Sequence, residues 1–187
     1  IHIDPIGAGM VPFPRKMIFW PFVFLPQEIS ETFELHKSEN CNKEPLVFIF
    51  SGSVNSAMRL KYIQLLYRAS IKFGIKYEIR TPEFSASNNG HDYYVKMSQC
   101  LGVINFTEKA KVNHPLITFR ALEALSVGAC LLEQSSAKFS SQLDMIAEPG
   151  LHFLSYRSPK ELVLLCRLLQ SNPSISDRSA EHTSELQ

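Results

Sequence analysis

The stretch from Phe119 to Gln134, F-R-A-L-E-A-L-S-V-G-A-C-L-L-E-Q, constrains the fold of this chain more than any other segment. Its first half carries apolar residues at helical spacing, so we expect Leu122 and Leu125 to face a core. Gly128 is well placed to end that helix, and an apolar run of strand length follows at residues 129–132. A helix, a tight turn and a buried strand in this order are typical of α/β proteins.

Strand-like and helix-like patterns alternate along most of the chain. Strands joined by helices favour right-handed crossovers and a parallel sheet. We therefore predict an α/β fold, a Rossmann-like parallel sheet with helices on both faces. The expected strands lie at 46–50, 77–80, 101–106, 129–132 and around His152, and the expected helices lie at about 60–73, ending at Gly74, at 91–100, from 119, at 140–146 and from Pro159, where Ser158 and Glu161 form a capping-box pattern.

Composition limits the kind of protein this can be. With 187 residues, 45% of them hydrophobic, the chain can bury one core of ordinary size. Its 20% charged residues and net charge of +1 argue against disorder and against a nucleic-acid partner. The longest apolar run, Met17–Leu25, is about half of the ~20 residues that a membrane-spanning helix needs. We therefore expect no transmembrane segment, and the absence of an initiator Met indicates a fragment.

Four cysteines, Cys41, Cys100, Cys130 and Cys166, show no short C-x-x-C spacing. Three of them lie in apolar segments, so we expect reduced core thiols rather than disulfides or metal ligands. Reduced thiols fit a cytoplasmic location. No His, Cys and Asp cluster has the spacing of a metal site, so no metal is expected.

Three regions are expected along the chain. Residues 1–44, rich in Pro and aromatic residues and then polar, are expected to be the remnant of an N-terminal domain or an interdomain linker. Residues 45–177 form the predicted domain. The last ten residues, 178–187, differ at one position from the translation of a common sequencing-library adapter, R-S-E-E-H-T-S-E-L-Q, so we expect a tail that is not native.

The pattern R-x-x-E-A-L-x-x-G-x-x-L-L, which starts at Arg120, resembles the donor-nucleotide segment of GT-B glycosyltransferases. The likeness is greatest to the group 1 branch that includes the spore-maturation type. The motif F-S-G-S at 50–53, an early Arg in the next helix and a closing E-P-G-L-H-F-L-S-Y at 148–156 follow in the order of that family. The resemblance covers roughly residues 45–173. It implies the C-terminal half of a GT-B fold, which binds a nucleotide-sugar donor without a metal cofactor, beside a missing N-terminal acceptor domain.

The resemblance implies that Glu123 accepts hydrogen bonds from the nucleotide ribose. Arg120 would contact the donor phosphate or hold Glu123 in place. From the residues alone, an alternative stays open, because the two side chains are three residues apart and can form a surface ion pair. Such a pair contributes only ~0.3–0.5 kcal/mol.

Ser51, Gly52 and Ser53 are candidates for holding the donor diphosphate. A tight glycine turn before a helix presents N–H groups and the positive end of the helix dipole to an anion. Arg59, or Lys61, is a candidate for stabilising the departing diphosphate by its positive charge. The alternatives are an ordinary tight turn and solvated surface cations.

One departure from the wider retaining GT-B pattern, E-x(7)-E, concerns the loop before Glu123. Pro115 stands where the first carboxylate would be. Asn113 and His114 in the same loop are candidates for contacts with the sugar or phosphate, the alternative being an ordinary loop. Retention or inversion of stereochemistry stays open.

The sequence thus predicts a glycosyltransferase fragment that binds the nucleotide-sugar donor. The competing class is a non-catalytic nucleotide-binding or interaction module on the same fold, because a fold alone does not fix an activity. A pocket at the carboxyl ends of the strands that contains Glu123 and Gly52 would favour the first. Dinucleotide binding is not expected, since no G-x-G-x-x-G follows any strand.

Overall fold

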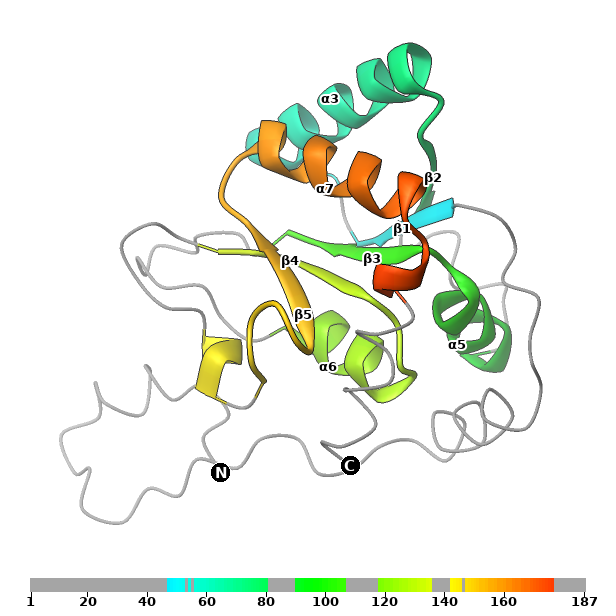
Figure 1. Cartoon of the computed structure of the whole chain (residues 1–187), viewed down its shortest axis with the longest axis vertical. Helices are drawn as coiled ribbons and strands as arrows, with labels where there is room; N and C mark the ends of the chain where they lie inside the picture. Colours follow the sequence, from blue (N-terminus) through cyan, green and yellow to red (C-terminus); the bar gives the residue numbers. More distant parts are fainter. Residues whose placement is uncertain are drawn as a thin grey trace, which may run out of the picture.

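The computed structural model describes residues 47–52, 54, 56–80, 90–106, 118–135, 142–145 and 147–176. Over these residues the chain forms a five-stranded sheet with the order β2-β1-β3-β4-β5, and every pair of neighbouring strands is parallel. Helices cover both faces of the sheet (Figure 1). The predicted α/β, Rossmann-like fold is confirmed.

The elements follow one another in strict alternation apart from one short 3-10 turn. Their bounds are β1 Val47–Ser51, α3 Ala57–Phe73, β2 Lys76–Arg80, α5 Gly90–Gln99, β3 Gly102–Asn105, α6 Phe119–Ser126, β4 Leu131–Gln134, the 3-10 turn Gln142–Met145, β5 Phe153–Tyr156 and α7 Pro159–Ser171.

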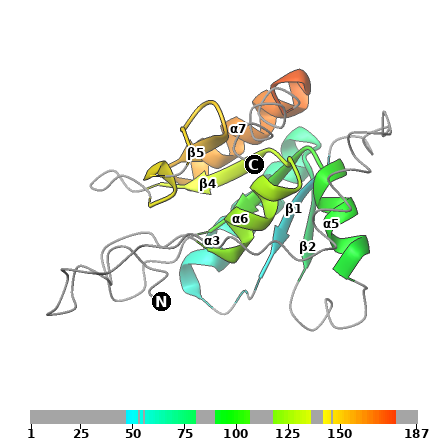
Figure 2. The ribbon, with the colours of Figure 1, turned by 90° about the horizontal axis from the view of Figure 1, so that it is seen from below.

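The core has two halves, one on each side of the sheet. Helices α3 and α7 pack together over one face, and α5 and α6 lie against the other, as Figures 1 and 2 show from two directions. The first half of the core joins Phe48, Phe50 and Leu132 of the strands to Leu66 of α3 and Cys166 of α7. The second joins Ile49, Val103 and Leu131 to Met97 of α5 and Ala124 of α6. Because both faces are covered, the central strand β3 is buried at all four positions.

Glycine residues end two helices, and a polar N-cap begins a third, where the sequence predicts. Gly74 follows α3 with a φ of 66°, and Gly128 follows α6 with a φ of 67°, a conformation that glycine adopts without steric cost. Ser158 caps α7 by accepting a hydrogen bond from the Glu161 N–H. The Glu161 carboxylate accepts from the N–H of Arg157 rather than from that of Ser158.

The structure corrects two details of the predicted elements and adds one. It adds that Leu60 and Tyr67 of α3 are exposed, whereas Tyr62, Leu66 and Ala69 face the core. Leu122 is only half-buried. In the predicted helix at 140–146, the described residues form a single 3-10 turn.

Several sequence predictions lie outside the described residues. These are the proposed N-terminal remnant at 1–44, the tail at 178–187, Cys41, Ser53, Asn113 and His114. Within the part of the chain that the structure describes, no helix is both long and apolar enough to cross a membrane.

Candidate functional site

The carboxyl edge of the sheet is the place where open α/β folds bind ligands, at the point where the strand order reverses. Here the chain moves outward from β1 to β2 and then returns to place β3 on the other side of β1. The reversal therefore lies between β1 and β3, whose last residues are Ser51 and Asn105. Among the predicted site residues, Ser51 ends β1 and each of the others comes after β1 or β3 in the sequence.

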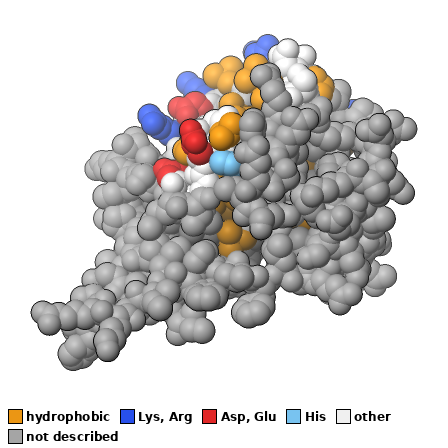
Figure 3. All heavy atoms as spheres, turned by 60° about the horizontal axis from the view of Figure 1, so that its bottom comes forward, with side chains coloured by type: hydrophobic (Ala, Val, Ile, Leu, Met, Phe, Trp, Pro, Cys, Tyr) orange, Lys and Arg blue, Asp and Glu red, His pale blue; other side chains and the backbone are white. Residues whose placement is uncertain are grey.

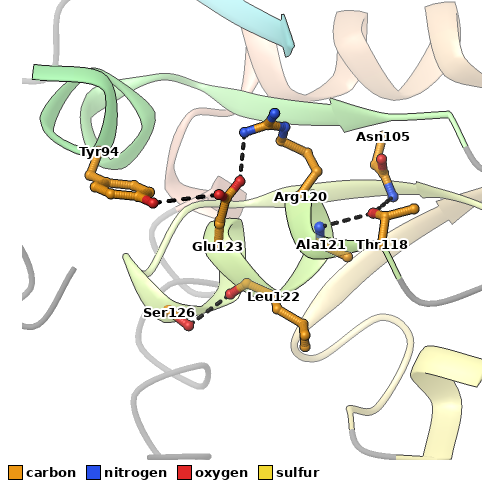
Figure 4. Close-up of polar contacts among 8 residues, drawn as sticks. All are labelled: Tyr94, Asn105, Thr118, Arg120, Ala121, Leu122, Glu123 and Ser126. Carbon is orange, nitrogen blue, oxygen red and sulfur yellow. Dashed lines mark hydrogen bonds and ion pairs between the residues drawn. The ribbon is translucent and has the colours of Figure 1, made fainter. Parts of the chain in front are cut away.

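Asn105 fixes the beginning of α6 at this edge. Its side-chain amide donates to the hydroxyl oxygen of Thr118 at 2.8 Å and to a carboxylate oxygen of Glu133 at 2.7 Å. Thr118 in turn caps α6, accepting a hydrogen bond from the N–H of Ala121 at 3.2 Å (Figure 4). The first turn of α6 is thus held at the carboxyl ends of β3 and β4.

A buried tyrosine on β5, the strand beside β4, completes this polar network. The hydroxyl of Tyr156 donates to the backbone carbonyl of Asn105 at 2.7 Å. Burial raises the pKa of Tyr156 well above its ordinary value, and the negative charge of Glu133 raises it further. Tyr156 is therefore a permanent hydrogen-bond donor at neutral pH, and Asn105 is held from both its backbone and its side chain.

Glu123 lies on α6, on the side that faces α5. One carboxylate oxygen accepts from Arg120 at 2.6 Å, and the other accepts a longer hydrogen bond, 3.4 Å, from the hydroxyl of Tyr94 (Figure 4). The guanidinium of Arg120 lies 5.0 Å from the centre of the Tyr93 ring, within the range of a cation–π contact. Both charged side chains are 23% exposed.

The ion pair that the residue spacing allows is therefore present in the structure. It does not exclude ligand binding, because an ionised carboxylate has about four acceptor sites and Glu123 uses two of them in these contacts. Arg120 orients the carboxylate, which is one of the two roles considered for it.

The turn after β1 has a conformation that glycine alone adopts readily. Gly52 has a φ of 147°, and its N–H donates to the backbone carbonyl of Arg80 at the end of β2, at 2.8 Å. This N–H is consequently not available to a phosphate in the described conformation. Ser51 beside it is half-buried.

Arg59 lies in the first turn of α3, the helix that follows this turn. Its backbone N–H donates to the side chain of the N-cap residue, Ser56, at 3.1 Å, and its side chain is half-buried. Lys61 is exposed. Arg59 thus lies in the first turn of the helix that follows β1, whereas Arg120 and Glu123 lie on the helix that follows β3.

Four residues of this edge, Tyr94, Asn105, Thr118 and Glu133, were missed by the sequence reasoning. Three of them carried a signal. Asn105 and Glu133 are polar residues that end otherwise apolar strand patterns. Thr118 stands directly before a helix, where a hydroxyl is typical of an N-cap. Tyr94 carried no signal, because its contact with Glu123 joins residues 29 positions apart.

Histidine and metal chemistry have little support among the described residues. His152 is buried, and its Nδ1 accepts a hydrogen bond from the N–H of Glu148 at 2.9 Å, which is a structural role. No group of three or more His, Cys, Asp or Glu side chains in the described ranges is arranged to hold a metal ion.

Comparison with known protein families finds a match. A family described as glycosyl transferase-like matches residues 63–185, which is more than half of the chain and spans β2 to α7. A search of curated proteins finds no matching relative. The matched span includes α6 with Arg120 and Glu123, and it runs into the last ten residues, whose proposed origin outside the native protein stays a prediction.

Proposed function

The chain belongs to the glycosyl transferase-like family, and on this premise we propose that it binds the nucleotide-sugar donor of a glycosyl transfer reaction. The donor would lie at the carboxyl edge of the sheet, between the loops that follow β1 and β3. The observation that carries the proposal is the hydrogen bond from Asn105 to Thr118, which fixes the first turn of α6, and with it the pair of Arg120 and Glu123, at that edge.

Glu123 is proposed to accept hydrogen bonds from the ribose hydroxyls of the nucleotide. Its carboxylate is partly exposed and already oriented by Arg120 and Tyr94, so little side-chain freedom would be lost on binding. Neutralisation by Arg120 lowers the cost of bringing the carboxylate near a negatively charged donor.

The diphosphate is proposed to lie over the turn that follows β1. Because the Gly52 N–H is used by Arg80, the donors there would be the hydroxyls of Ser51 and Ser53, together with the charge of Arg59. Asn113 and His114 remain candidates for contacts with the sugar or the phosphate. This division of roles needs no metal ion, since the Arg59 cation would offset the charge of the leaving group and the hydroxyl groups would donate hydrogen bonds to it.

The wider expectations belong to the same proposal. They are that the chain corresponds to the C-terminal half of a GT-B enzyme of the spore-maturation-like branch, that the acceptor binds to an N-terminal domain, and that the protein works in the cytoplasm.

Calorimetric titration tests the proposal with UDP-, GDP-, ADP- and CMP-sugars and two variants. One donor should bind, and Glu123→Gln should weaken it about 10- to 150-fold, since a hydrogen bond to a charged group contributes about 1.5–3 kcal/mol. Glu148→Gln is the matched control, because Glu148 is exposed and precedes the amino end of β5, at the opposite edge of the sheet. Equal dissociation constants for wild type and Glu123→Gln, or no binding of any donor, would contradict the proposal.

A further inference from the structure

Helices α3 and α7 expose five large apolar side chains on the side away from the sheet. Leu60, Tyr67 and Ile71 of α3 and Leu164 and Leu168 of α7 are between 44% and 72% exposed. On each helix they are spaced by four or seven residues, so they form one ridge along α3 and another along α7. Figure 3 shows, near the top of that view, exposed hydrophobic side chains together with Lys, Arg, Asp and Glu side chains.

A basic groove of about 380 Å³ lies between the two helices. Arg68 and Lys72 of α3 line it together with Lys160 and Arg167 of α7. Apolar side chains form the rest of its lining. Among them is Phe73, whose ring centre lies 4.3 Å from the Arg167 guanidinium and 5.3 Å from the Lys72 ammonium.

Positive charge predominates on helices α3 and α7. Helix α3 contains four basic and no acidic residues, and α7 contains two basic residues and one acidic residue, Glu161. The whole chain has a net charge of only +1, so positive charge is concentrated on these two helices. Among the described residues, the ion pairs within 4 Å join Arg80 to Glu78 and Arg120 to Glu123, and the four cations of the groove take no part in them.

We propose that the α3/α7 face binds the surface of an anionic lipid bilayer. Exposed apolar side chains flanked by Lys and Arg are the pattern of helices that lie in the membrane interface, where the apolar groups enter the headgroup region and the cations meet lipid phosphates. The long stems of the Lys and Arg side chains can follow the apolar surface while their charged ends stay at the phosphates.

Charge complementarity selects this occupant over two others. A second copy of the chain would bring two cationic surfaces together, which like-charge repulsion opposes. A nucleic acid would use the basic groove but would leave the five exposed apolar side chains without a partner, whereas a bilayer accommodates both kinds of side chain. The residues of α3 and α7 that are changed in the test below lie apart from Glu123, because these two helices cover the face of the sheet opposite to α6 (Figure 1). They also lie at least two turns along α3 from Arg59, or on α7.

The test is flotation of the full chain with vesicles of phosphatidylcholine alone or with about 30% phosphatidylglycerol. Binding should require the anionic lipid and should weaken with added salt. The double variant Arg68→Gln, Lys72→Gln should bind the anionic vesicles about 25-fold more weakly, since each basic residue near the surface contributes about fivefold. Ile71→Ser with Leu164→Ser should lose about tenfold or more.

Lys96→Gln is the matched control, since Lys96 is an exposed lysine of α5 on the opposite side of the sheet. Its binding should stay within about twofold of wild type. The proposal is overturned if the chain floats equally with neutral and anionic vesicles or with neither, or if Lys96→Gln loses as much as the α3 double variant. It is equally overturned if sedimentation shows a dimer that Ile71→Ser dissociates, or if an oligonucleotide binds while the vesicles do not.

Discussion

At the scale of single residues, burial determines the chemistry of the cysteines. Cys100, Cys130 and Cys166 are buried thiols that take part in no disulfide, which confirms for these three the prediction of core thiols. Burial raises the pKa of the Cys166 thiol from 9.0 to about 12, and the neighbouring Cys130 adds to the effect. Since the thiolate is the reactive form, Cys166 should be inert in the folded protein.

The raised pKa of Cys166 predicts a loss of stability in alkali. Between pH 8 and pH 10 the unfolded thiol ionises while the folded thiol keeps its proton, so the unfolded state binds fewer protons. The free energy of unfolding should therefore fall by about 1.4 kcal/mol from this residue. Urea unfolding at several pH values should show that Cys166→Ala lacks this part of the decrease. If the free energy of unfolding fell with pH equally in the variant and the wild type, the raised pKa of Cys166 would be contradicted.

Glu123 shows how far a residue's role can be predicted from sequence. The spacing from Arg120 predicts the ion pair, and the structure contains it at 2.6 Å. The contact with Tyr94 could not be predicted, because it depends on how α5 packs beside α6. In the same way, S-G-S predicts a glycine turn, but the use of the Gly52 N–H by Arg80 follows from the pairing of β1 with β2.

At the scale of elements, the start of α6 depends on contacts outside the helix. An eight-residue helix is too short to be stable alone in water. Thr118 caps it, and Asn105 ties that cap to the buried Glu133, which is 2% exposed. Because α6 carries Arg120 and Glu123, this network determines where the proposed donor-binding pair lies.

Two cap variants separate the stability of a helix from its positioning. Thr118→Ala and Ser158→Ala should each lower the free energy of unfolding by about 1 kcal/mol, because each removes a hydroxyl N-cap. Thr118→Ala alone should also weaken donor binding, by about 3- to 10-fold, since it frees the first turn of α6. Unfolding curves and calorimetric titrations measure the two effects. If both variants, or neither, changed the donor affinity, the positioning role of Thr118 would be wrong.

Helix ends were predictable and helix faces were less so. Gly74 and Gly128 mark their helix ends because a local conformation demands glycine there. The helical period alone did not show which side of α3 is buried, since Leu60 and Tyr67 lie on the side away from the sheet. Which side of a helix is buried depends also on how the neighbouring helix packs, and for α3 that neighbour is α7.

At the scale of the whole molecule, the alternating pattern predicts a parallel sheet but not its order. Local patterns determine the handedness of each crossover, whereas the side of β1 on which β3 lies depends on packing across the whole sheet. The order β2-β1-β3-β4-β5 places the reversal between β1 and β3, and so brings the carboxyl ends of these two strands side by side. The positions of Ser53, Asn113 and His114 within those loops stay predictions.

The chain by itself is expected to bind a donor but to transfer almost no sugar. If it corresponds to the donor-binding half of a two-domain enzyme, it supplies the nucleotide-sugar pocket but not the groups that position and activate an acceptor. Proximity of the two substrates contributes about 7–11 kcal/mol to such reactions, so a chain that binds one substrate should be nearly inactive. The donor found by titration should bind, while release of its nucleoside diphosphate should stay at the uncatalysed rate with or without simple sugar acceptors. Turnover with an acceptor that Glu123→Gln abolishes would show instead that this chain contains a complete active site.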